Sequence, residues 1–116
     1  MLLQRHDTNL RSYFVWGSFL PTDNVNAARA ATVKYGAPDS IYFWMPDSRL
    51  AADFAITLRL PIGYLAWKVY LLYRRGIIWD RLPPQPTYWQ QQLEVLQGEK
   101  FDIASMEVEI QRALRE

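Results

Sequence analysis

The sequence LPIGYLAWKVYLLYRRGIIW, residues 60–79, is apolar nearly all the way round a helix and decides the fold that the sequence predicts. Ile62 and Val69 lie on one broad apolar stripe. Pro61 suits the first turn of a helix, and Gly76 suits its end. A helix that is apolar on most of its circumference is normally buried inside a fold or against partner subunits. We therefore predict a central, largely buried helix in this stretch.

Two aromatic runs lie before this stretch. Residues 12–20 and 40–46 are rich in aromatic and β-branched side chains, which favour strands. Between them the chain predicts a helix that Asp23 or Thr22 caps and that Gly36 ends. We expect the two runs to pair as a two-stranded ribbon, which is stable only when it packs against helices.

Three more helices are predicted from capping signals. The first covers about residues 48–59 and ends before Pro61, because a residue that precedes proline avoids helical geometry. The second begins with a capping box at Thr87 and stops at Gly98. The last begins near Asp102 or Ser105 and carries apolar residues at helical spacing.

The predicted fold class is therefore mainly α: a compact domain of four to five helices with a small two-stranded β element near the N-terminus. We expect residues 1–116 to form a single domain. Its expected parts are an N-terminal arm (1–11), an aromatic ribbon with the central helices (12–82), a Pro-rich connector (83–87) and C-terminal amphipathic helices (88–116).

Aromatic residues make up 15% of the chain, including five Trp and seven Tyr, and half of all residues are hydrophobic. This composition excludes a disordered chain. Aromatic side chains are also typical anchors of protein interfaces, although a small core can simply use large side chains. The interface candidates are Trp16, Trp44, Trp67, Tyr70, Trp79 and Trp89.

The net charge is only +1, but it is spread unevenly. Residues 1–87 contain ten basic and six acidic groups, and residues 88–116 contain three basic and six acidic groups. A basic patch on the central helix could face the phosphates of single-stranded nucleic acid or lipid head groups. We favour a solvated edge or an intersubunit salt bridge, because the total positive charge is too low for strong phosphate binding. The patch consists of Lys68, Arg74, Arg75 and Arg81.

The sequence offers little material for catalysis. It has no cysteine, which excludes disulfides and thiolate zinc sites, and its one histidine is His6. His6 lies beside Asp7 near the N-terminus, and sequence neighbours rarely face one reaction centre. A Ser-His-Asp arrangement would need that histidine. We therefore predict no catalytic, cofactor-binding or metal-binding residues, and a protein that is not an enzyme.

The N-terminal sequence MLLQRHDTNL has polar and charged residues where a secretory signal has its apolar region. We also expect no transmembrane span, because the most apolar window, residues 50–73, contains Asp53, Arg59 and Lys68. Peripheral contact with a membrane stays open.

Residues 59–103 resemble the second half of tailed-phage head–tail connector (adaptor) proteins, in which a helix after a Leu-Pro pair is followed by a Pro-bearing connector and a second helix. The resemblance implies a ring-forming structural subunit of a virion without catalytic residues. The positions that carry it are Pro61, Tyr70, Leu72, Tyr73, Trp89, Leu93, Leu96 and Gly98.

The sequence therefore predicts a non-catalytic structural subunit of a larger assembly, and a phage head–tail connector is its sharpest form. Its partners would be other protein subunits, in a homo- or hetero-oligomer. Two alternatives stay open: a peripheral accessory subunit of a membrane protein complex, such as a respiratory or photosynthetic one, and a small nucleic-acid-binding module. Outside a virion we expect an intracellular or membrane-peripheral protein.

Overall fold

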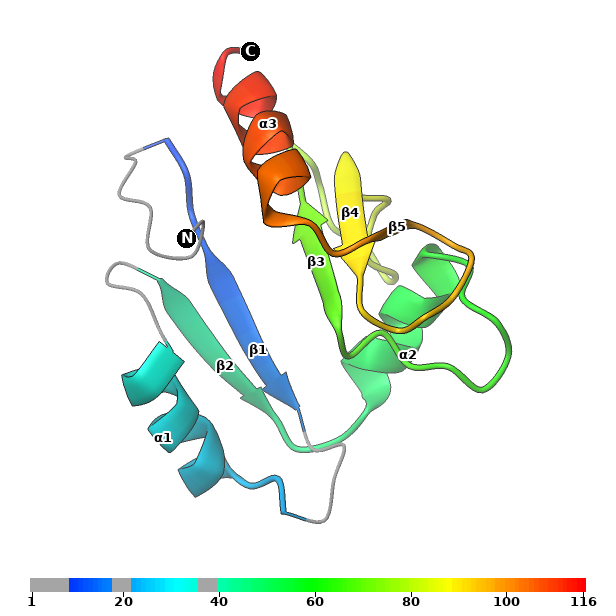
Figure 1. Cartoon of the computed structure of the whole chain (residues 1–116). Helices are drawn as coiled ribbons and strands as arrows, with labels where there is room; N and C mark the ends of the chain where they lie inside the picture. Colours follow the sequence, from blue (N-terminus) through cyan, green and yellow to red (C-terminus); the bar gives the residue numbers. More distant parts are fainter. Residues whose placement is uncertain (1–8, 18–21, 36–39) are drawn as a thin grey trace. The chain divides into compact units, whose positions relative to one another are not determined.

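The computed structural model describes residues 9–17, 22–35 and 40–116 (Figure 1). His6, Gly36 and the end of the expected 12–20 strand lie outside these residues. The chain divides into two compact units, Met1–Ser48 and Arg49–Glu116, which we call the N-terminal and the C-terminal unit. Their boundary falls within residues 12–82, which were predicted to form one continuous part of a single domain.

The N-terminal unit is a β-α-β arrangement of strand β1 (Tyr13–Gly17), helix α1 (Val25–Tyr35) and strand β2 (Ile41–Met45). The two strands pair in parallel, with Tyr13 opposite Ile41. Parallel strands need a long crossover connection, and α1 supplies it. The predicted pairing of the two aromatic runs and the helix between them are both confirmed.

Helix α1 begins at Val25, one residue later than a cap at Asp23 requires and two later than a cap at Thr22 requires. The side-chain oxygen of Asn24 accepts the backbone N–H of Ala27 at 2.8 Å, which is the geometry of an N-cap. The prediction of Asp23 or Thr22 as the cap is therefore wrong. Asn24 takes this role because it directly precedes the first helical residue, Val25, so its short side chain reaches the third N–H.

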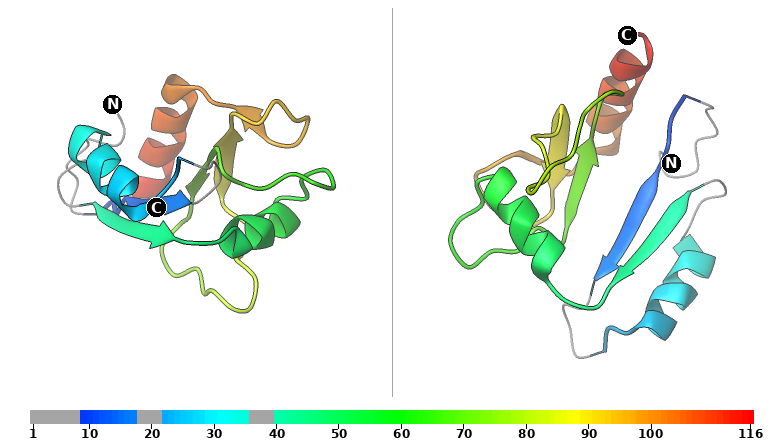
Figure 2. Two further views of the ribbon diagram at one scale, coloured as in Figure 1. Left: turned by 90° about the horizontal axis from the view of Figure 1, so that it is seen from below. Right: turned by 180° about the vertical axis from the view of Figure 1, so that it is seen from behind.

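The C-terminal unit contains a three-stranded sheet with the strand order β3-β4-β5. β3 (Val69–Leu72) pairs antiparallel with β4 (Tyr88–Gln91), and β4 pairs in parallel with β5 (Glu99–Lys100). Helices α2 (Arg49–Thr57) and α3 (Ile103–Leu114) lie on opposite faces of this sheet (Figures 1 and 2). Helices were predicted at both positions, and both are confirmed.

Strand β3 is apolar on both faces because both faces of the sheet are covered. Val69 and Leu71 pack against the core cluster of α2 and the following loop, which is built on Phe54, Leu58 and Ala66. On the other face Leu72 is buried, and so are Met106 and Ile110 of α3.

The predicted fold class, mainly α with four to five helices, is wrong. The described residues form three helices and five strands, an α/β arrangement. The largest error is the central helix over residues 60–79, which is a loop followed by β3 and a second loop. A continuous apolar run fits a doubly covered strand as well as a buried helix, and periodicity cannot separate the two.

The chain leaves α2 through two consecutive turns. Arg59 has a φ of +57°, and the N–H groups of Arg59 and Leu60 donate to the carbonyls of Ile56 and Ala55, which is a Schellman motif. Next, the N–H of Tyr64 donates to the carbonyl of Pro61, in a turn whose third residue, Gly63, has a φ of +91°. These turns place Val69 at the start of a strand.

The predicted helix between Thr87 and Gly98 is also wrong, since this segment forms β4 and the loop after it. The N–H of Thr87 donates to the carbonyl of Leu72 at 2.8 Å, and its hydroxyl accepts the N–H of Arg74 at 3.2 Å. Both groups of Thr87 therefore bond to residues in β3 or just after it, and neither caps a helix. The predicted start of the last helix is confirmed: Asp102 caps α3 by accepting the N–H of Ser105 at 3.1 Å.

Candidate interaction surfaces

The sheet of the N-terminal unit has one face that carries α1 and one that does not. The indole N–H of Trp16 donates to the hydroxyl of Thr32 in α1 at 2.9 Å, and the rings of Phe14 and Tyr42 stack on the same face at 4.9 Å. Because successive side chains of a strand alternate, the residues between these point to the opposite face.

This opposite face, which we call the outer face, presents four large apolar side chains to solvent. Tyr13 is 58% exposed, Val15 47%, Ile41 41% and Phe43 50%. Parallel sheets occur almost only with both faces covered. None of the four side chains is charged, and no described element of the N-terminal unit covers them, so the outer face is an apolar surface of the kind that marks a binding site.

The six predicted aromatic anchors fall into two groups. Trp16, Trp44, Tyr70 and Trp89 are half-buried. Trp16 bonds to α1, Tyr70 packs on Phe101 with ring centroids 4.4 Å apart, and Trp89 borders the core cluster.

The other two anchors are exposed and lie in the loops of the C-terminal unit. Trp67 is 42% exposed and has the ammonium group of Lys68 4.6 Å from its ring centroid. Trp79 is 51% exposed, and its ring contacts Phe54 edge-on and Tyr73 at a tilt. The rings of Phe54 and Tyr73 therefore hold Trp79 in place, and about half of its surface is open to solvent.

The predicted basic patch is divided by β3. Lys68 precedes this strand, whereas Arg74 and Arg75 follow it, so they do not form the single stripe that a helix would give. Arg74 forms an ion pair of 2.6 Å with Glu116. Arg75 and Arg81 are exposed, and no ion pair within the described residues involves either side chain.

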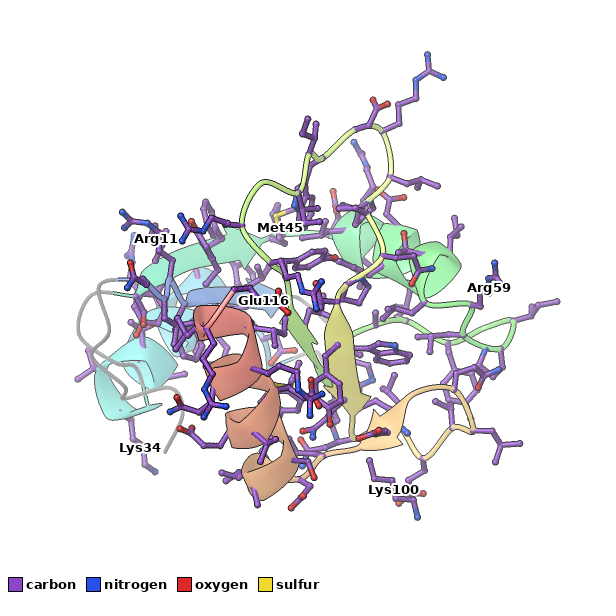
Figure 3. All side chains as sticks on the ribbon, turned by 90° about the horizontal axis from the view of Figure 1, so that it is seen from above. Arg11, Lys34, Met45, Arg59, Lys100 and Glu116 are labelled. Carbon is purple, nitrogen blue, oxygen red and sulfur yellow. The ribbon has the colours of Figure 1, made fainter. Side chains whose placement is uncertain are left out.

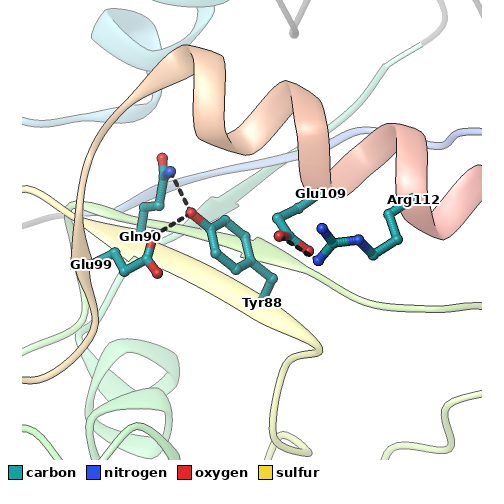
Figure 4. Close-up of polar contacts among 5 residues, drawn as sticks. All are labelled: Tyr88, Gln90, Glu99, Glu109 and Arg112. Atoms are coloured by element: carbon teal, nitrogen blue, oxygen red, sulfur yellow. Dashed lines mark hydrogen bonds and ion pairs between the residues drawn. The ribbon is translucent and has the colours of Figure 1, made fainter.

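The most connected polar cluster centres on two buried glutamines that sequence reasoning did not select. Gln90 is fully buried, and its amide donates to the hydroxyl of Tyr88 at 2.8 Å (Figure 4). The same amide pairs with the backbone of Asp102, donating to its carbonyl and accepting from its N–H. Gln91 holds the next loop by bonding to Leu93 and Val95.

The pKa values of two groups in this cluster, Tyr88 and Asp102, are shifted by their surroundings. The Tyr88 hydroxyl donates to the Glu99 carboxylate at 2.6 Å, and burial together with this bond raises the pKa of Tyr88. The bonds from Ser105 lower the pKa of Asp102. Glu109 lies nearby but pairs with Arg112 at 2.9 Å (Figure 4). The cluster thus joins β4, β5 and α3 through bonds within the chain.

Two kinds of feature are absent from the described residues, a metal-binding cluster and a membrane-spanning helix. No group of three or more His, Cys, Asp or Glu side chains in residues 9–17, 22–35 and 40–116 is arranged to hold a metal ion. No helix in the same part of the chain is long and apolar enough to cross a membrane. Comparison of the chain with known protein families, curated proteins and solved structures found no match.

Proposed function

We propose that this protein is a non-catalytic subunit of a protein assembly, and that its N-terminal unit binds a second copy of the chain through the outer face. The observation that carries the proposal is the exposure of Tyr13, Val15, Ile41 and Phe43 on one side of a parallel two-stranded sheet. A sheet of two strands is marginally stable by itself, so covering this face also stabilises the unit.

The chemistry of the outer face suits a second copy. A two-fold symmetric interface uses the same patch on both subunits, so the patch must complement itself. Uncharged apolar side chains meet this condition because they bring no like charges together. Contiguous exposed apolar patches of roughly 300–600 Å² on a monomer are often functional, and four large side chains about half exposed approach that size.

The polar cluster around Gln90 supports the non-catalytic part of the proposal. Its amide oxygen and nitrogen bond to Asp102 and Tyr88, and the Tyr88 hydroxyl bonds to Glu99. A catalytic cluster needs groups directed at a substrate in a pocket. These groups are instead directed at the backbone and side chains of their own unit.

A phage head–tail connector is a more specific kind of assembly subunit, but it forms a ring through head-to-tail contacts and not through one two-fold patch; the sequence resemblance over residues 59–103 alone supports it. The resemblance assumes helices, whereas several of its positions, Tyr70 and Trp89 among them, lie in strands here. The general proposal therefore stands on the outer face. A closed ring of fixed subunit number in native mass spectrometry would support the specific form, and a dimer would contradict it.

The general proposal is tested by light scattering during size-exclusion chromatography of the full chain over a range of protein concentrations. We expect the wild type to self-associate. Phe43→Asp should weaken association by about 100-fold or more, because an unpaired charge in an apolar interface costs several kcal/mol. Val33→Asp is the matched control, since Val33 is 89% exposed on α1 in the same unit.

Association that both substitutions weaken equally would contradict the outer face as the interface. A wild-type monomer at every concentration would contradict the second copy as its occupant. Circular dichroism of Phe43→Asp shows whether the variant is folded. If it is not, Phe43→Ser replaces it.

A further inference from the structure

We propose that the loops on either side of β3 form a docking surface for anionic lipid membranes. This surface belongs to the C-terminal unit and is independent of the outer face. It consists of residues 59–68, which follow α2, and residues 75–82, which lie between β3 and β4.

The first argument is the concentration of exposed apolar side chains in these two loops. Ile62 is 104% exposed and Ile78 86%, so each stands free of its neighbours at a loop tip. Apolar side chains with this much exposed surface can insert into the acyl chains of a membrane. Five more large apolar side chains in the loops are also exposed: Tyr64, Trp67, Ile77, Trp79 and Leu82.

The second argument is that both loops are anchored to the same helix. The first continues from the C-terminal end of α2, where Arg59 projects outward (Figure 3). The second lies against α2, because the Thr57 hydroxyl donates to the carbonyl of Pro83 at 2.7 Å. The contact between Phe54 and Trp79 adds a further anchor.

Two more hydrogen bonds fix residues 84 and 85, which follow the second loop. The Tyr73 hydroxyl donates to the carbonyl of Pro84 at 2.7 Å, and the Gln85 amide donates to the carbonyl of Thr57. Ile56, also on α2, is 61% exposed, so the helix adds a further apolar side chain next to the loops. An anchored loop loses little conformational freedom on binding.

The third argument is charge. Residues 59–82 contain five basic groups and one acidic group, for a net charge of +4, whereas the rest of the chain carries −3. Arg74 is paired with Glu116, which leaves Arg59, Lys68, Arg75 and Arg81 for an anionic surface. Basic residues beside exposed Trp, Tyr and Ile are the combination that interfacial segments use at lipid head groups.

Vesicle sedimentation of the full chain tests the proposal. We expect binding to vesicles of phosphatidylcholine with phosphatidylserine and much weaker binding to phosphatidylcholine alone. Arg75→Gln combined with Arg81→Gln should weaken binding by about 25-fold, at about fivefold per cation. Added salt should also weaken the binding of the wild type, because it screens the attraction between the cations and the lipid head groups. Ile78→Ser should weaken it tenfold or more by removing an inserted side chain.

Two matched controls lie outside the surface in the same unit. Leu96→Ser removes a side chain that is 100% exposed, and Lys100→Gln removes an exposed cation, and neither should change vesicle binding. Absence of binding to both kinds of vesicle, or an equal loss of vesicle binding in the control variants, would overturn the proposal. Tighter binding to a single-stranded oligonucleotide that Ile78→Ser leaves unchanged would overturn it in favour of a nucleic-acid surface.

Discussion

Gly98 lies at the turn between β4 and β5 with a φ of +73°, a conformation that side chains other than glycine disfavour. Its second constraint is the indole of Trp89: a Cβ atom at position 98 would lie 2.5 Å from two ring carbons. Since Trp89 borders the core cluster around Phe54, it cannot move aside without disturbing that cluster. Both the conformation of the turn and the close packing of Trp89 therefore require glycine at position 98.

Gly98→Ala should lower the free energy of unfolding by about 2–4 kcal/mol, from left-handed strain and overpacking against the indole. Urea unfolding followed by tryptophan fluorescence measures this loss. Gly76→Ala is the control, because Gly76 has a φ of +82° but open space around it, and strain alone costs about 1–2 kcal/mol. Equal losses in the two variants would show that the indole yields.

Tyr73 makes the stability of the C-terminal unit sensitive to high pH. Burial raises the pKa of Tyr73 to about 12 from 10.0. Below pH 10 the hydroxyl is protonated in both the folded and the unfolded state, so the contribution of Tyr73 to stability is constant. Between pH 10 and 12 only the unfolded state loses the proton, so stability falls as pH rises. In urea titrations Tyr73→Phe should show a shallower fall over this range. An unchanged slope would assign the fall to other groups.

At the scale of elements, the parts of the fold that sequence predicts are those with local signals. Strands β1 and β2 and helices α1, α2 and α3 each have a cap, a turn or a composition that acts within a few residues. Strands β3 and β4 do not. Val69–Leu72 is apolar on both faces, so only its pairing with Tyr88–Gln91 makes it a strand, and that partner is 16 residues away at the nearest pair, Leu72 with Tyr88.

The candidate surfaces show the same division. Both faces of β1 and β2 are apolar in sequence, so alternation alone does not reveal that α1 covers Trp16 and leaves Phe43 open. Lys68, Arg74 and Arg75 were predicted to share one helix, and the structure has β3 and two loops in its place. Gln90 gave no signal, because its partner Asp102 is twelve residues further along the chain.

Gln90 joins β4 to the N-terminus of α3, and its loss should separate the two elements. Gln90→Ala leaves the backbone N–H of Asp102 without its partner, removes one of the two hydrogen bonds to the Asp102 carbonyl, and opens a cavity at a fully buried position. We expect a loss of about 2–4 kcal/mol in the free energy of unfolding, measured with urea.

Gln92→Ala is the matched control for this variant. The Gln92 side chain accepts a hydrogen bond from the Tyr70 hydroxyl at an exposed position, so its loss should cost less than about 1 kcal/mol. If Gln90→Ala were as mild as Gln92→Ala, water would be replacing the lost amide, and the connection between β4 and α3 would not depend on Gln90.

At the scale of the whole molecule, the two units differ in how much core they contain. Among the described residues of the N-terminal unit, Ala28 is the one hydrophobic residue that is buried. The C-terminal unit has a cluster around Phe54 on one face of its sheet and Met106 with Ile110 on the other. A two-stranded sheet with so little core is at the limit of stability in water, so the N-terminal unit depends most on a partner.

Hydrogen exchange of the full chain should therefore depend on protein concentration in one unit only. Association stabilises what it covers by mass action, so amides of β1 and β2 should exchange quickly in dilute protein and slowly in concentrated protein. Amides of β3 and β4 should be protected equally at both concentrations, because their sheet is covered by α2 and α3 of the same unit. Phe43→Asp should abolish the concentration dependence in β1 and β2, whereas Val33→Asp should preserve it. Protection of β1 and β2 that matched β3 and β4 in dilute protein would mean that the N-terminal unit is stable without a second copy.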